Sequence, residues 1–288
     1  MRAAVIAIRA GIFDDVSEVD DVCAGHASSA AVARTACRPA AGPMPWAGDD
    51  VGGPMVLAAA GHAGAGASTV ALAVAEGLAE SRRVHLVDYA EPVRSGLVAA
   101  SSIELGTDGA GWRHGRRGGL DVFRLARRSA DGELPPVPET DDAERLVVVD
   151  AGWSLTCALL DFPGSLVRGA MVVVVTRVTV PAVRQTEHLL GAVDGTAVVA
   201  AVGPARWPQV VEASCGPQLR ELRVRGRVVP VPVDRRLEPA GLTGDRLPKP
   251  VAAAGRALAA LLVPSGSPQP RHRRRPAWSG TGPAGHTR

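Results

Sequence analysis

The sequence predicts an α/β fold: a three-layer, doubly wound, mostly parallel sheet of about seven strands with helices on both faces. Two observations lead to this prediction. Short apolar runs such as MVLAAA and AMVVVVT alternate along the chain with longer stretches whose apolar residues recur at helical spacing. Several of the runs, such as MVLAAA and the AMVVVV part of AMVVVVT, are apolar at every position, which is typical of parallel strands buried on both faces. A chain of 288 residues, 46% of them hydrophobic, is long enough to bury such a core.

Seven strands are predicted in chain order, each an apolar run bounded by turn-forming residues. They span residues 55–60, 84–89, 120–126, 145–151, 170–176, 196–202 and 228–233. Helices are expected between and after them, at about 68–81, 155–168, 180–193, 208–224 and 250–263. The Gly- and Arg-rich span 106–119 shows neither period, so we expect a surface loop between the second and third strands.

The ordered domain is expected to span residues 55–263. Residues 1–54 are predicted to be a flexible leader, because their second half is rich in Ala, Gly, Pro and Ser without a helical or alternating period. Residues 264–288 are predicted to be a disordered basic tail. The formal net charge of the chain is +3, and the tail contains five arginines and no acid, so the domain itself is not basic.

Composition also bears on the compartment. No apolar run approaches the roughly 20 residues that span a bilayer. Arg9 interrupts the apolar N-terminal run, and acidic residues follow it where a signal peptide would be cleaved. The four cysteines, Cys23, Cys37, Cys157 and Cys215, lack the spacing of a metal site or a disulfide framework. We therefore expect a cytoplasmic protein with reduced thiols and no transmembrane segment.

The segment GHAGAGAST, residues 61–69, follows the first predicted strand and opens the first predicted helix. Its three glycines can adopt backbone angles that other residues avoid, so that successive amides converge on an anion at the positive end of the helix. Ser68 and Thr69 can present a hydroxyl to Mg²⁺. The predicted nucleotide-binding residues are Gly61, His62, Gly64, Ala65, Gly66, Ala67, Ser68 and Thr69. The alternative is a glycine turn with a Ser or Thr cap that serves packing alone.

Four later segments make the pattern more specific, and together with the loop they resemble the ParA/MinD family of deviant Walker A P-loop ATPases. VHLVDYAEPVRSGL (84–97) resembles the family's second, aspartate-containing motif, and RLVVVDAG (145–152) resembles its Walker B strand. AMVVVVTRVTVPAVRQTEHLL resembles the strand, turn and helix that come next, and VVPVPVDRR resembles the late strand and loop beside the base. The resemblance covers residues 55–263 and implies a P-loop NTPase-like domain.

The resemblance implies ATP or ADP with Mg²⁺ as the cofactor. Asp88 matches the first aspartate of the second motif, and Asp150 matches the Walker B aspartate that supports magnesium through water. Together with Ser68, these two aspartates are the predicted metal ligands. For both aspartates, the alternative is a strand-end carboxylate that only caps the next helix.

Three positions depart from the family's pattern. In place of the family's two loop lysines the chain has His62, where the lysine reaches across a dimer, and Ala67, where it holds the β and γ phosphates. Ala90 replaces the second aspartate, which orients the attacking water. Because phosphoryl transfer depends on positioning and electrostatic stabilisation, we expect weak or absent ATP hydrolysis, and whether the chain is an enzyme stays open.

Substitution by other groups is a minority alternative. His62 is only partly protonated near neutral pH. Arg94 and Arg177 follow strand ends from which they can reach phosphates, although charged residues near loops are more often solvated. Glu91 offers a carboxylate beside Ala90, but from a different direction.

The leading hypothesis is a ParA/MinD-like partition or positioning factor, serving plasmid or chromosome segregation or localisation at a cell pole or septum. It would act as a homodimer with a protein partner, either a centromere-binding or an assembly protein. One alternative is an active, slow ATPase of the same family; another is a regulator or assembly factor of a conjugative, pilus or secretion system. Nonspecific DNA contact is a further option for the tail, through Arg271, Arg273, Arg274 and Arg275, although a solvated tail explains the same run.

Overall fold

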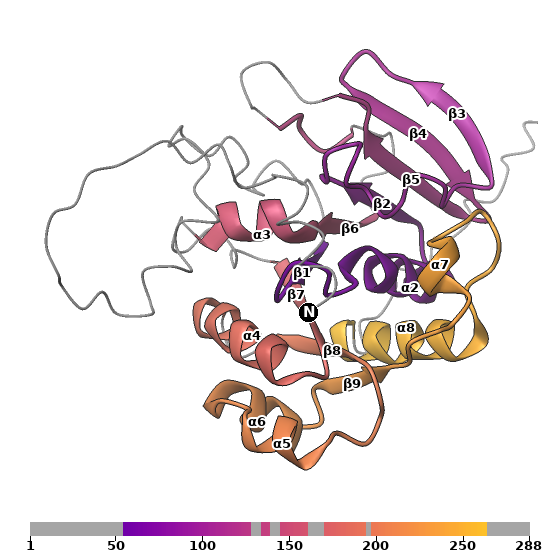
Figure 1. Cartoon of the computed structure of the whole chain (residues 1–288). Coiled ribbons are helices and arrows are strands. Elements are labelled where there is room, and N and C mark those ends of the chain that lie inside the picture. The colour runs from indigo at the N-terminus through magenta and orange to yellow at the C-terminus, as the bar shows by residue number, and fades with distance from the viewer. Residues whose placement is uncertain (1–53, 128–133, 139–144, 161–169, 194–196, 264–288) are drawn as a thin grey trace, which may run out of the picture. The chain divides into compact units, whose positions relative to one another are not determined.

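The computed structural model describes residues 54–127, 134–138, 145–160, 170–193 and 197–263 (Figure 1). The predicted leader, apart from its last residue, and the predicted tail with its arginines lie outside the described residues. The second half of the helix predicted at 155–168 also lies outside them.

The strands form one nine-stranded sheet in the order β3-β4-β5-β2-β6-β1-β7-β8-β9 (Figure 1). Their bounds are β1 Met55–Ala60, β2 Val84–Asp88, β3 Ile103–Thr107, β4 Trp112–Arg117, β5 Leu120–Leu125, β6 Leu146–Ala151, β7 Ala170–Arg177, β8 Val198–Val202 and β9 Val228–Val231. The seven strands from β5 to β9 in this order run parallel, whereas β4 is antiparallel to β5 and to β3. These seven parallel strands are the seven that the sequence predicts.

The helices are α2 Ala67–Ala79, α3 Gly152–Leu160, α4 Val180–Ala192, α5 Gln209–Ala213, α6 Pro217–Val224, α7 Leu237–Ala240 and α8 Lys249–Leu262. Apolar residues of α2 and α8 pack on one face of the sheet, and those of α3, α4, α5 and α6 pack on the other. The predicted three-layer α/β architecture is therefore confirmed.

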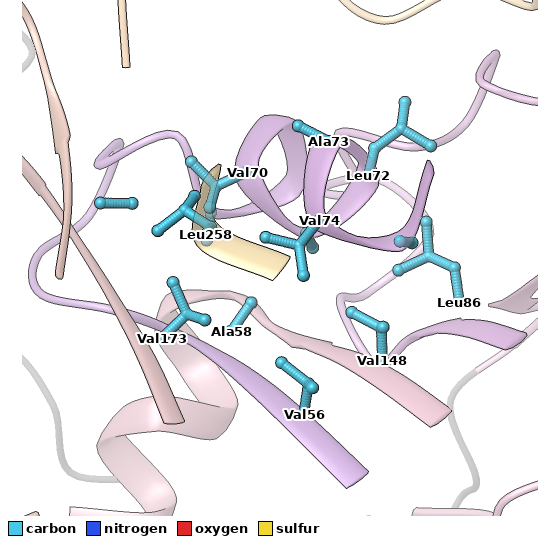
Figure 2. Close-up of a cluster of buried hydrophobic side chains, with 14 of the residues drawn as sticks. Val56, Ala58, Val70, Leu72, Ala73, Val74, Leu86, Val148, Val173 and Leu258 are labelled. Atoms are coloured by element: carbon cyan, nitrogen blue, oxygen red, sulfur yellow. The ribbon is translucent and has the colours of Figure 1, made fainter. Parts of the chain in front are cut away.

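Period-two alternation divides the central strand between the two cores. Val56 and Ala58 of β1 belong to the α2 face, whereas Leu57 and Ala59 belong to the opposite face. Figure 2 shows the first of these cores, where Val74 of α2 points toward the strand residues below it. Because both faces of β1 are covered, an uninterrupted apolar run is the pattern that this strand requires.

Helices α2 and α8 pack against each other at glycines. A Cβ added to Gly255 of α8 would lie 2.1 Å from the Ala73 carbonyl oxygen of α2. One added to Gly77 of α2 would lie 3.1 Å from backbone atoms of Arg256. The two backbones approach this closely because neither glycine carries a side chain at the contact.

The predicted surface loop at 106–119 is wrong: it contains the end of β3 and all of β4, which form an antiparallel hairpin. The hairpin raises the strand number from about seven to nine. Its buried positions are a tryptophan, a glycine and an ion-paired arginine, so no apolar alternation marks it. Trp112 makes a T-shaped contact with Tyr89, and buried Arg117 pairs with Glu76 of α2 at 2.5 Å.

The helix predicted at 208–224 is two helices, α5 and α6. Pro217 lacks an amide proton and so begins a new helix. The Glu187 carboxylate of α4 caps it by accepting hydrogen bonds from the amides of Gln218 (2.7 Å) and Leu219 (3.2 Å). The Glu187 carboxylate therefore satisfies amides in the first turn of α6 that have no partner within the helix.

The order of the sheet locates the expected ligand site. The chain builds β2 and β6 on one side of β1 and then crosses to place β7 on the other side. In open α/β sheets, ligands bind outside the carboxyl ends of the strands at such a switch point. Within the described part of the chain, no helix combines the length and apolar character needed to cross a membrane.

Candidate functional site

Residues 61–66 join the carboxyl end of β1 to the first turn of α2. Gly64 (φ 75°) and Gly66 (φ 96°) are left-handed, and Gly66 is the residue that precedes the helix. The amides of the first helical turn have no partner inside the helix and carry its positive end. The loop and the first turn of α2 bring all eight predicted nucleotide-binding residues together at this end.

Gly61 serves packing instead of a left-handed turn. Its amide donates to the Val175 carbonyl oxygen of β7 at 2.8 Å. A Cβ at this position would lie 2.3 Å from the Thr186 Oγ1 atom and 2.9 Å from that same carbonyl oxygen. Thr186 in turn donates to Thr176 Oγ1 at 2.7 Å, which fixes α4 beneath the end of β7.

His62 is hydrogen-bonded within its own chain. The Arg177 amide donates to His62 Nε2 at 3.2 Å, and His62 Nδ1 lies 2.8 Å from the Ala63 carbonyl oxygen. Because a backbone amide can only donate, Nε2 is the acceptor in this contact. Both ring nitrogens of His62 therefore contact backbone groups of the chain itself.

Ala67 is the first residue of α2 and is buried in the core between this helix and the sheet. Ala65 is buried in the same core, while Ser68 and Thr69 are half-buried. The loop thus offers amides and hydroxyls, and none of its own residues is a lysine or an arginine.

Two predicted metal ligands meet at the carboxyl ends of neighbouring strands. Asp88 of β2 and Asp150 of β6 are register partners, and Asp150 is also the partner of Ala58 on β1. Both aspartates are fully buried. They lie two residues beyond Leu86 and Val148, whose side chains pack on the α2 face, so their carboxyl groups point to that face as well.

Asp88 is held by two donors. Its Oδ1 atom accepts from the Ala90 amide at 2.8 Å, and its Oδ2 atom accepts from the Ser95 hydroxyl at 2.5 Å. Burial and the charge of Asp150 raise the pKa of Asp88 to about 7, although both hydrogen bonds and the charge of Arg124 act in the opposite direction. Near neutral pH this carboxyl group is therefore readily protonated in the absence of a cation.

Asp150 has one unsatisfied oxygen. Its Oδ1 atom accepts from the Gly152 amide at 3.0 Å. Among the described residues, no donor lies in hydrogen-bond geometry to its buried Oδ2 atom, although the Ser68 hydroxyl lies close enough to act on the carboxyl group. Burial raises the pKa of Asp150, and the Ser68 hydroxyl and the Gly152 amide oppose the rise. Ser68 packs against Gly96, since a Cβ added to Gly96 would lie 2.7 Å from the Ser68 Oγ atom. A buried carboxylate oxygen without a donor calls for a cation or a proton.

The donor set fits Mg²⁺. Hydroxyl and carboxylate oxygens are the ligands that magnesium prefers, and it is usually bound through one or two carboxylates with waters and phosphates. Among the described residues, no group of three or more His, Cys, Asp or Glu side chains is arranged to hold a metal ion. These residues therefore do not form a metal site built from protein side chains alone, of the kind that holds zinc. A magnesium ion that also binds phosphate and water needs fewer protein ligands, such as the Ser68 hydroxyl and the two carboxyl groups.

Two polar neighbours of Asp88, Ser95 and Arg124, were not predicted from the sequence. Arg124 of β5 is the register partner of Asp88 and is buried. Its Nη2 atom lies 2.6 Å from each carboxylate oxygen of Glu104, and its Nη1 atom donates to the Val98 carbonyl oxygen. The available signal was an arginine inside an apolar predicted strand, because a buried charge requires partners.

The residues that could replace the missing lysines and carboxylate differ in whether they contact the loop. Arg94 is exposed and pairs with Glu91 at 3.6 Å, so these two groups neutralise each other. Ala90 contributes only its amide, which binds Asp88. Arg177, at the end of β7, donates from Nε to the Gly64 carbonyl oxygen at 3.0 Å. Of the two arginines, only Arg177 touches the loop.

No protein-family model and no curated protein matches this chain. Several solved structures are similar to it at low identity. One is a ParA family ATPase from Chlorobium tepidum, with 13% identity and a TM-score of 0.42; the match covers 72% of this chain and 98% of that one. Another is the MinC:MinD cell division protein complex from Aquifex aeolicus, with 14% identity and a TM-score of 0.45; the match covers 71% of this chain and 95% of that one. A third is apo McdA from Cyanthece, with 13% identity and a TM-score of 0.47; the match covers 73% of this chain and 100% of that one.

Proposed function

We propose that this chain is a ParA/MinD-like P-loop protein that binds ATP or ADP with Mg²⁺ through residues 61–69 and hydrolyses ATP weakly or not at all. The observation that carries the proposal is the buried Oδ2 atom of Asp150, for which the described residues supply no donor in hydrogen-bond geometry. It belongs to a carboxyl group that the Ser68 hydroxyl approaches, at the start of the helix that follows a glycine loop.

Binding would use the backbone more than side chains. The left-handed Gly64 and Gly66 shape the loop, and the positive end of α2 favours phosphate. Ser68, Asp150 and Asp88 would hold Mg²⁺, directly or through water. A bound magnesium ion neutralises phosphate charge, and it would also relieve the repulsion between the two buried carboxyl groups.

Hydrolysis would lack its usual charges. Position 67 is a buried alanine, position 90 is an alanine, and position 62 is a histidine whose Nε2 atom accepts from the Arg177 amide. Single cations that stabilise a transferring phosphoryl group are worth roughly 10³ to 10⁵ in rate. The combined absence of two lysines and a water-orienting carboxylate favours nucleotide binding without turnover.

The cellular role that we propose is partition or positioning, by a homodimer that contacts a protein partner in the cytoplasm. The support is the family resemblance of five ordered segments over residues 55–263. Nonspecific DNA contact would come from the arginines at 271 and 273–275. Deleting residues 265–288 should then abolish duplex DNA binding while nucleotide binding persists; DNA binding that survives the deletion would exclude the tail as the contact.

The nucleotide site is tested by titrating the full chain with a fluorescent ATP analogue, in Mg²⁺ and in EDTA. Ser68→Ala should weaken binding in Mg²⁺ by about tenfold and leave binding in EDTA unchanged, because it removes only a metal ligand. Ser81→Ala is the matched control, since Ser81 follows the other end of α2 and donates to the Leu78 carbonyl oxygen. Equal affinities of the Ser68→Ala and Ser81→Ala variants in Mg²⁺ would contradict the assignment of Ser68.

A further inference from the structure

The loop has lost its lysines, yet one guanidinium group lies against it. Arg177 is the last residue of β7, which pairs with β1 in parallel so that Ala60 and Val175 are register partners. Parallel strands that pair in this way end at the same edge of the sheet. Arg177 therefore lies beside the loop that leaves β1, although 113 residues separate it from Gly64.

Both the main chain and the side chain of Arg177 are attached to the loop. Its amide donates to His62 Nε2 at 3.2 Å, and its Nε atom donates to the Gly64 carbonyl oxygen at 3.0 Å. Gly61 and Thr186 lock the end of β7 beneath these contacts. The guanidinium group is thus held at Gly64 in the loop, and its two Nη groups donate to no acceptor among the described residues.

The charge of Arg177 has no counter-ion among the described residues, and its side chain is exposed. The other arginines near the site each have a carboxylate. Arg94 pairs with Glu91, Arg124 with Glu104 and Arg117 with Glu76. The groups that Arg177 does contact are the Gly64 carbonyl oxygen and the His62 imidazole, and neither of them is an anion that would neutralise the guanidinium charge.

We propose that Arg177 binds a phosphate of the nucleotide held by residues 61–67, in place of the lysine absent at position 67. This inference rests on the proposed nucleotide site and names the class of ligand that the site selects, a nucleoside di- or triphosphate. A guanidinium group presents its donors in a planar fork that matches two phosphate oxygens. With Nε fixed to the loop, the Nη groups supply this fork without a large loss of side-chain entropy.

The test compares the affinities of ATP, ADP and adenosine for the full chain, measured by displacement of a fluorescent nucleotide. Arg177→Gln should weaken ADP and ATP binding by about ten- to one-hundredfold, as expected for charge-assisted hydrogen bonds, and leave adenosine binding within twofold. Its binding of ADP should also depend less on salt than that of the unmodified chain. Arg94→Gln is the matched control and should change none of these affinities.

The outcomes separate the inference from the nucleotide site itself. If the Arg177→Gln variant binds ADP as tightly as the unmodified chain, or loses affinity for adenosine and ADP equally, Arg177 does not contact phosphate and the inference is wrong. The proposed nucleotide site is then unaffected. If the unmodified chain binds none of the three ligands, both proposals fail. Should Arg177→Gln not fold, Arg177→Lys decides: unchanged adenosine affinity with weakened ADP affinity supports phosphate contact, and a uniform loss for all ligands overturns it.

Discussion

At the scale of single residues, Asp88 determines a pH dependence of the metal-free protein. Its carboxyl group has a pKa of 3.8 in the unfolded reference and of about 7 in the folded chain. Between these values the folded state binds more protons than the unfolded state, so the free energy of unfolding falls as the pH rises from about 4 to 7. The loss is complete above the folded pKa, where Asp88 must be ionised in both states.

Asp88→Asn removes this titration. The amide oxygen can still accept from Ala90, and the Ser95 hydroxyl can accept from the new amide in place of donating. In EDTA at pH 8, the variant should be more stable than the unmodified chain by about 2–4 kcal/mol, and near pH 4 the two should agree. Urea denaturation at both pH values measures this, with exposed Asp245→Asn as the control. A stability difference that is the same at both pH values would refute the assignment.

The residues at the site were only partly accessible from sequence. Asp88 and Asp150 were predicted because the segments around them resemble family motifs, and parallel strands bring the residues at their carboxyl ends to one edge of the sheet. Ser95 and Arg124 were not, because their role depends on register and on a turn that no local pattern encodes. The pairing of β1 with β7 likewise decides that Arg177, and not Arg94, contacts the loop.

At the scale of elements, the β3–β4 hairpin is attached to the domain by Arg117. Besides its pair with Glu76, this buried side chain donates to the carbonyl oxygens of Ala100, Thr243 and Asp245. It thereby joins a strand, a helix and two loops. A buried arginine leaves no hydrophobic period in the sequence, so the hairpin was predicted to be a loop. The seven parallel strands, which are mostly apolar, were located to within two residues.

Replacing Arg117 should therefore destabilise the whole fold. Arg117→Met leaves three carbonyl oxygens and a carboxylate without their donor, and we expect the free energy of unfolding to fall by about 3 kcal/mol or more. Arg116→Met, on the same strand, is the control. Arg116 is half exposed and its pair with Asp121 should be worth less than about 1 kcal/mol. Equal melting temperatures of the two variants would show that the buried arginine is not an anchor.

The contact between α2 and α8 provides a second prediction at this scale. Gly255→Ala places a methyl group against the Ala73 carbonyl oxygen and should force the helices apart, at a cost of about 1–3 kcal/mol in unfolding free energy. Gly191→Ala in α4 has open space around its Cβ and should be neutral or stabilising by up to about 1 kcal/mol. Thermal unfolding compares the two; a Gly255→Ala variant as stable as Gly191→Ala would contradict the close packing.

At the scale of the whole molecule, the sheet order brings the loop after β1, the aspartates of β2 and β6 and the arginine of β7 to one edge. The three-layer fold follows from the hydrophobic pattern, because the parallel strands are mostly apolar and both faces of the sheet are covered by apolar helix residues. What the site does chemically depends instead on a few positions where charge is absent. We propose that this edge of the sheet binds a nucleotide without hydrolysing it.

That claim is tested most directly by a single-turnover measurement. The purified full chain, in excess over radiolabelled ATP and with Mg²⁺ present, is incubated, and the nucleotide bound to the protein is separated and identified over several hours. We expect the bound nucleotide to remain ATP throughout. Conversion of the bound ATP to ADP and phosphate within minutes, or the absence of any bound nucleotide, would contradict the account.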